Sequence, residues 1–168
     1  MGTDVGLLLA RDHEELERSL VMLIEPWRSD ADKRSALDDL CVGFVAHAEG
    51  QSAVLWEALA QSPAAAVRRA VIQVFAAHEA QESVLTELRS VAPSTARWHD
   101  LVQQLRDLLR VHSEQEDQSV LGALRAHIEP ARYQRLAGAY ATERLRALGM
   151  LHPMSVIDRS ARRPAARP

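Results

Sequence analysis

Residues 96–127 read ARWHDLVQQLRDLLRVHSEQEDQSVLGALRAH, and this stretch indicates the fold class of the chain. Its apolar residues recur every three or four positions, which is the spacing of an α-helix with one face packed inward. The inward positions on this spacing are Leu101, Leu105, Leu108, Leu109, Val120, Leu121 and Leu124. Glu129-Pro130 then breaks the pattern. We therefore predict one long amphipathic helix over residues 96–127.

Three earlier segments show the same spacing and predict helices over about residues 4–24, 32–60 and 64–88. Proline-containing breaks separate them at Pro26, Ser62-Pro63 and Ala92-Pro93-Ser94. A shorter fifth helix is predicted over about residues 131–148, ending at Gly149. Four long helices with short connections are expected to pack as an all-α, up-down antiparallel four-helix bundle. Residues 1–150 would form this domain, and residues 151–168, rich in Arg, Ala and Pro, a flexible tail.

The composition excludes several classes of protein. A formal net charge of -3 provides no broad basic surface for nucleic acid. The single cysteine, Cys41, excludes an intramolecular disulfide and a cysteine-cluster metal site. No apolar run approaches the roughly 20 residues that cross a bilayer, and charged residues from Arg11 onward interrupt any secretory signal. We expect a soluble cytoplasmic protein that binds neither nucleic acid nor membrane.

One histidine lies near the middle of each long predicted helix: His13, His47, His78 and His112. Apolar residues share the helix face of each one, so these imidazoles are expected to point into the bundle. A single inward histidine is usually a hydrogen-bonded core residue. Four of them, one from each helix, can meet at one level, and imidazole is a favoured ligand of iron, zinc, copper and nickel.

Carboxylates at helical spacing strengthen the case for a metal site. A histidine and a residue four positions later lie on one helix face, one turn apart. This spacing occurs as His112–Glu116 and His78–Glu82, and with an amide in place of the carboxylate as His47–Gln51. One such pair is weak evidence, because glutamate is common on solvated helices. The ordered set is much stronger. The remaining histidines, His99, His127 and His152, are expected at the surface, and Tyr133 and Tyr140 are expected to pack.

This ordered set resembles the signature of the hemerythrin-like, or HHE cation-binding, family. The family pattern is a helix-one His, a helix-two H-x-x-x-E, a helix-three His and a helix-four H-x-x-x-E. The surrounding residues are similar as well, notably Arg11-Asp12-His13-Glu14-Glu15-Leu16 and Val111-His112-Ser113-Glu114-Gln115-Glu116, and the resemblance spans about residues 5–148.

The resemblance implies a bundle that holds two non-haem irons joined by carboxylate bridges. His13 and His47 would serve one iron, His78 and His112 the other, and Glu116 would bridge them. Gln51 departs from the pattern, because it stands where the family has its second bridging carboxylate. Three outcomes are open: two irons with Gln51 as a weak or absent ligand, a replacement carboxylate from Glu82, or only one iron held firmly.

Three functions fit this interpretation. The first is an iron protein that binds or responds to O2, NO or peroxide, alone, with a protein partner or as a homodimer. The second is an oxidase, oxygenase or peroxidase-like enzyme in which Gln51 leaves the centre under-ligated. The third is a metal-free structural bundle. The resemblance alone does not choose among them.

Overall fold

The computed structural model describes residues 3–62 and 64–151, and every regular element in these ranges is helical. The elements are α1 (Val5–Ile24), α2 (Asp30–Gln61), α3 (Ala65–Ser90), α4 (Ala96–Gln115), the π-helical turn η1 (Glu116–Val120), α5 (Leu121–His127) and α6 (Pro130–Leu151). The predicted all-α class is confirmed. The predicted C-terminal tail lies outside the described residues, except for Leu151 at the end of α6.

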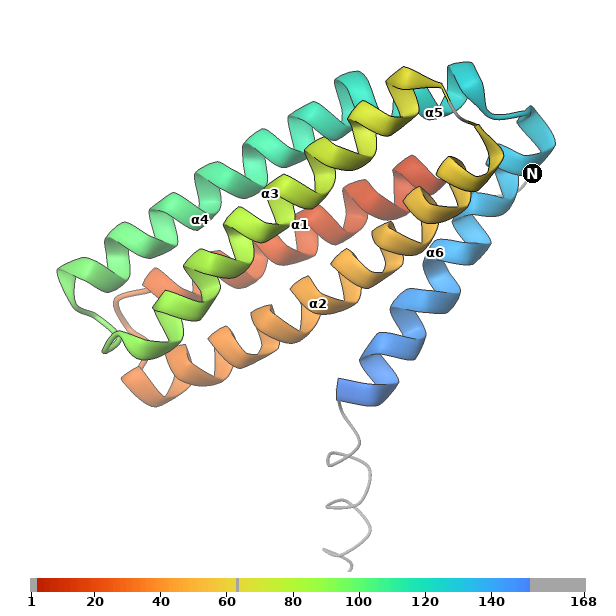
Figure 1. Cartoon of the computed structure of the whole chain (residues 1–168). Coiled ribbons are helices and arrows are strands. Elements are labelled where there is room, and N and C mark those ends of the chain that lie inside the picture. The colour runs from red at the N-terminus through yellow and green to blue at the C-terminus, as the bar shows by residue number, and fades with distance from the viewer. Residues whose placement is uncertain (1–2, 63, 152–168) are drawn as a thin grey trace, which may run out of the picture.

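The helices α1 to α4 lie side by side, and α5 continues the course of α4 (Figure 1). Each of α1 and α3 packs against both α2 and α4. The last helix, α6, lies outside this group, where it packs extensively on α2 and also contacts α1. The 22-residue helix α6 therefore covers one side of the bundle.

The helix boundaries follow local signals in the sequence. Ser29 and Asp32 form a capping box at the start of α2, and the side chains of Asp4 and Thr95 cap α1 and α4. The predicted end of the fifth helix at Gly149 is wrong, because α6 continues to Leu151. A glycine in a helix costs only about 1 kcal/mol relative to alanine, which does not by itself stop a helix.

The apolar core is divided into two clusters along the bundle. The first contains the N-terminal part of α1, the C-terminal part of α2, the first half of α3, η1, α5 and part of α6; its members include Leu9, Val54, Leu55, Val71, Val74, Leu121, Leu124 and Tyr140. The second lies at the other end of these helices and includes Leu16, Leu20, Leu37, Phe44, Leu85, Trp98, Leu101 and Leu105. Each of α1, α2 and α3 thus contributes to both clusters, and so does α4 together with its continuation through η1 and α5. Each of these four has a stretch between the clusters.

Side chains fix the far end of the second cluster. The Trp98 ring is fully buried, and its Nε1 donates to the backbone oxygen of Leu23 at 2.9 Å. Arg34 donates to the backbone oxygen of Arg89 at 2.8 Å. These bonds satisfy carbonyls that lie at or near the ends of α1 and α3, where the helices themselves provide no donor.

Among the described residues, no helix is both long enough and apolar enough to span a bilayer.

The close packing of α6 on α2 at Gly50 gives a test of the fold. A Cβ at Gly50 would lie 2.9 Å from Cε2 and 3.2 Å from the backbone oxygen of Tyr140. We expect Gly50→Ala to lower the free energy of unfolding by about 1–3 kcal/mol, as overpacking does, despite the better helix propensity of alanine.

Gly138→Ala on α6 is the matched control, because a Cβ there would meet nothing within 4 Å. It should raise the stability by up to about 1 kcal/mol. Urea unfolding of the two variants measures both effects, and equal stabilisation by both would contradict the packing described for α6.

Candidate metal centre

A layer of polar side chains fills the space between the two apolar clusters. This polar layer consists of Asp12, His13, His47, Gln51, His78, Gln81, His112 and Glu116. All but His13 are buried, and even the His13 side chain is only 11% exposed. Each of α1, α2 and α3 contributes two members of the layer, and the remaining two are His112 of α4 and Glu116 at the start of η1.

Four members of the polar layer converge closely enough to hold one metal ion. One donor atom from each of His13, His47, His112 and Glu116 lies within 4.8 Å of the others. The Nε2 atoms of His13 and His112 lie 3.4 and 3.5 Å from Oε2 of Glu116. Ligands bound at roughly 2 Å from one ion lie a few ångströms apart, so small adjustments would suffice.

The fourth predicted histidine borders this group. The His78 ring centroid lies 4.9 Å from that of His112 and 5.6 Å from that of His47. His78 is buried but is outside the set of four whose donor atoms lie within 4.8 Å of one another. The structure therefore brings all four predicted histidines to one level, and places three of them around Glu116.

The side-chain atoms of the layer that could bind a metal have no hydrogen-bond partners among the described residues. These are the Nε2 atoms of all four histidines and both carboxylate oxygens of Glu116. Leaving a buried polar group unpaired costs about 1–3 kcal/mol. Nitrogen lone pairs and a carboxylate around one space fit a metal ion such as iron or zinc, which would give partners to His13, His47, His112 and Glu116.

Burial keeps the imidazoles of His13, His78 and His112 uncharged. Burial, together with the charge that a protonated His47 would carry, lowers the pKa of His13 to about 3. The same two effects lower the pKa of His78 to about 3, and burial with the three neighbouring histidines lowers that of His112 to about 2. Neutral imidazole is the form that ligates metals.

Glu116 shows the opposite shift. Burial raises its pKa to about 8, Asp117 adds to the rise, and the Gln51 amide opposes it. Without an ion the carboxyl group would therefore be largely protonated at neutral pH. A positive charge placed among its neighbours would favour the carboxylate.

Gln51 lies in the layer, buried one turn beyond His47. Its Oε1 has no partner among the described residues. The alternative that Glu82 supplies a carboxylate is wrong, because Glu82 is exposed. The inward position after His78 is occupied by Gln81, which is fully buried and donates to the backbone oxygen of Leu108 at 3.4 Å.

The buried stripe of α3 explains why Gln81, and not Glu82, points inward after His78. Its buried residues advance by alternating steps of four and three, through Val67, Val71, Val74, His78, Gln81, Leu85 and Leu88. The step after His78 is three residues and not four. The corresponding stripes of α2 and α4 have a step of four after His47 and His112 and so select Gln51 and Glu116.

Asp12 is a member of the layer for which the sequence analysis assigned no role. Tyr140 donates to its Oδ2, and Arg144 Nε donates to the same oxygen at 2.5 Å. Burial raises the pKa of Asp12, but interactions with His47, Tyr140 and Arg144 outweigh it and hold the pKa below its ordinary value. A signal was present in the sequence, because Asp12 occupies a position of the buried stripe of α1 between Leu9 and Leu16.

The π-helical turn begins at Glu116. Its closing bond runs from the Leu121 N–H to the Glu116 carbonyl, five residues back. The wider turn lets Glu116 face the polar layer while both Val120 and Leu121 enter the first apolar cluster. Such turns occur often at functional sites, and this one was not predicted from the helical periodicity.

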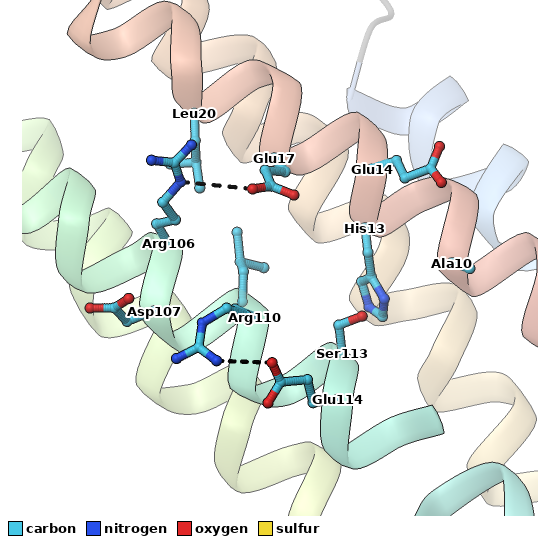
Figure 2. Close-up of a pocket in the computed structure, with 11 residues that line it drawn as sticks. Ala10, His13, Glu14, Glu17, Leu20, Arg106, Asp107, Arg110, Ser113 and Glu114 are labelled. Atoms are coloured by element: carbon cyan, nitrogen blue, oxygen red, sulfur yellow. Dashed lines mark hydrogen bonds and ion pairs between the residues drawn. The ribbon is translucent and has the colours of Figure 1, made fainter. Parts of the chain in front are cut away.

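A pocket of about 320 Å³ lies between α1 and α4 and reaches His13 (Figure 2). The small side chain of Ser113 lies beside the imidazole, and Ala10, further along α1, also lines the pocket. Two ion pairs line the pocket: Arg106–Glu17 at 3.8 Å and Arg110–Glu114 at 2.9 Å. His13 thus separates a solvent-accessible pocket from the buried part of the layer.

The other predicted surface histidines, His99 and His127, are exposed, and His152 lies outside the described residues.

Comparisons with known proteins add no relative: no family model matches the chain, and neither the curated proteins nor the solved structures contain a match.

The lowered histidine pKa values predict how the stability of the metal-free protein depends on pH. Below about pH 6.5 the unfolded chain binds protons that His13, His78 and His112 do not bind in the folded state. Stability should therefore fall as the pH is lowered from about 6.5 toward 3, by up to about 1.4 kcal/mol per pH unit for each histidine. Glu116 has the opposite effect on stability. Between its ordinary pKa and about pH 8 the folded state holds its proton and the unfolded chain does not, so stability falls as the pH rises.

For these groups together, stability should be greatest near pH 6.5 and fall on both sides. Urea unfolding of chelator-treated protein across this range measures it, and His112→Gln should reduce the slope on the acid side. A stability that is constant between pH 6.5 and 4.5 would contradict the shifts.

Proposed function

We propose that this chain is a hemerythrin-like protein, an up-down antiparallel four-helix bundle that holds non-haem iron in its polar layer and binds or responds to O2, NO or peroxide. The observation that carries the proposal is the convergence of His13, His47, His112 and Glu116, whose donor atoms are within 4.8 Å of one another. The side-by-side packing of α1 to α4 supports the bundle arrangement (Figure 1).

Iron is proposed because the donors and the resemblance agree. Imidazole with carboxylate suits iron, zinc and manganese, and the single cysteine, Cys41, lies outside the group. Donor chemistry alone does not distinguish iron from zinc, and the resemblance to the hemerythrin-like pattern favours iron. When bound, iron would supply a redox-active centre with coordination positions for a small ligand. The protein would supply a buried site from which bulk water is excluded.

We propose one firmly held ion and a weaker second position. Three imidazoles and Glu116 would hold the first ion. The second position would lie next to His78 and would face the buried, uncharged amide of Gln51, where the resemblance would place a carboxylate. A neutral ligand compensates less of the charge of a second cation, so the two-iron occupancy that the resemblance implies would be partial.

An enzyme that activates O2 or peroxide is the second candidate function, and the pocket at His13 favours it. The pocket has room for a small molecule and extends to one of the proposed ligands (Figure 2). The weaker ligand set at Gln51 would also leave coordination positions open. Reversible binding without a substrate distinguishes the first function from this one.

Metal content tests the proposed site. The purified protein, reconstituted anaerobically with ferrous iron and desalted, should retain between one and two irons per chain by elemental analysis. His112→Ala should lose most of this iron and keep its helical circular dichroism, because it removes a buried donor. The matched control is His127→Ala on α5, which removes an exposed imidazole and should leave the iron content unchanged. Equal iron in all three proteins would refute the site.

The same measurement tests the role of Gln51. Gln51→Glu restores a carboxylate to the buried position after His47, so retained iron should rise toward two per chain. Gln118→Glu, at an exposed position of η1, controls for added negative charge. If Gln51→Glu changes neither the iron content nor the visible spectrum, Gln51 does not face a second metal position.

Exposure of the ferrous protein to O2, NO or peroxide distinguishes the two functions. A carrier or sensor should give a visible spectrum that forms with the ligand and reverses when O2 or NO is removed. An oxidase or peroxidase should consume oxidant over many turnovers when a reducing substrate is present. A protein that retains iron but responds to none of the three would exclude both functions.

A further inference from the structure

Hydrogen bonds join α6 to the polar layer. Which group donates in each of them determines the tautomer of His47, that is, which ring nitrogen carries the hydrogen. His47 Nδ1 lies 3.1 Å from the hydroxyl oxygen of Tyr140, and Tyr140 in turn donates to Oδ2 of Asp12. His47 is 1% exposed, so water does not compete for these groups. Nδ1, which contacts Tyr140, is therefore not the His47 nitrogen proposed to bind the metal. That nitrogen is Nε2, which has no hydrogen-bond partner among the described residues.

Arg144 keeps Asp12, the last acceptor in this series of hydrogen bonds, in its carboxylate form. Its Nε donates to Asp12 Oδ2 at 2.5 Å, and its terminal nitrogen donates to Glu15 Oε2 at 3.2 Å. A guanidinium group remains charged and has no acceptor, so Asp12 beside it is a carboxylate, which can only accept. The single hydroxyl proton of Tyr140 must therefore be given to Asp12.

The direction of the remaining contact follows. With its proton directed to Asp12, the Tyr140 oxygen offers only lone pairs to His47. The contact is attractive only if His47 Nδ1 carries a hydrogen. In a neutral imidazole the hydrogen on Nδ1 leaves Nε2 with a lone pair, and Nε2 is the atom among the other proposed ligands.

The shape of α2 supports the same arrangement. Gly50 lies one turn beyond His47, and a Cβ there would come within 2.9 Å of the Tyr140 ring. A glycine at this position lets the ring lie against the α2 backbone, where its hydroxyl reaches His47. Tyr140 is 1% exposed and so is held on all sides.

We propose that Tyr140, Asp12 and Arg144 form a hydrogen-bonded relay that holds His47 as the Nδ1–H tautomer and so keeps its Nε2 ready to bind a metal. Tyr140 is then a positioning residue supplied by α6, and α6 completes the site without contributing a ligand. The tautomer does not depend on any metal. The effect on metal affinity rests on the proposed function.

Nitrogen-15 NMR of histidine-labelled, metal-free protein tests the tautomer directly. With His47 assigned by comparison with His47→Gln, wild-type protein at pH 7.5 should show its Nδ1 protonated and its Nε2 unprotonated. Tyr140→Phe keeps the ring and removes the hydroxyl, and should give a mixture of tautomers at His47. Tyr133→Phe removes the hydroxyl of the other α6 tyrosine, which contacts Asp4 at 3.5 Å, and should leave the His47 signals unchanged.

Metal affinity gives the second measurement. Partners that orient a ligating histidine typically change metal affinity by about 10–100-fold. Tyr140→Phe should weaken binding of ferrous iron or of Co2+, used as a spectroscopic probe, by about this factor, and Tyr133→Phe should not. If Tyr140→Phe does not fold, Arg144→Met serves instead, with Arg146→Met, which removes an exposed ion pair with Glu143, as its control. Arg144→Met should weaken metal binding and Arg146→Met should not.

The outcomes separate the two proposals. An Nε2–H tautomer in wild-type protein, or wild-type tautomer and affinity in Tyr140→Phe, would overturn the relay. An Nδ1–H tautomer that is lost in Tyr140→Phe would support the relay even if neither protein binds metal, and in that case the proposed metal function would fail alone.

Discussion

The rest of the structure depends on the burial of a polar layer between two apolar clusters. Water cannot reach the four Nε2 atoms or the Glu116 carboxyl group, and none of these atoms has a hydrogen-bond partner among the described residues. Such groups are costly in a core of this kind unless something else binds them. The arrangement is therefore explained better by a bound cation than by stability of the bundle alone, which an all-leucine layer would serve better.

The same layer also fixes how the helices are aligned. Sliding one long helix by a turn would place leucines against unpaired imidazoles and move its histidine into an apolar cluster. A buried polar residue is known to specify register in coiled coils in this way. In this bundle all four long helices contribute at one level, so the register of each one is constrained by the other three.

Much of the fold and of the site could be predicted because both depend on helical periodicity. The long apolar segments predicted the helices, and the histidines on those stripes predicted the residues that meet. The alternative that Glu82 supplies a carboxylate was wrong because it applied a fixed spacing of four to α3, whose stripe takes a step of three after His78. The alternating steps were readable in the sequence and would have selected Gln81. The partners of Asp12 were not readable, because Tyr140 and Arg144 come from a helix whose packing on α1 and α2 is set by tertiary contacts.

The π-helical turn at Glu116 has a consequence for the two halves of the core. A continuous α-helix has one rotational phase along its whole length, so the side chains at one end dictate which face is presented at the other. The extra residue within η1 breaks that dependence between α4 and α5. The half of the helix that carries Trp98 and Leu105 and the half that carries Leu121 and Leu124 can each be oriented by its own neighbours. Glu116 lies at the junction, where the orientation of the backbone is not dictated by the rotational phase of either half.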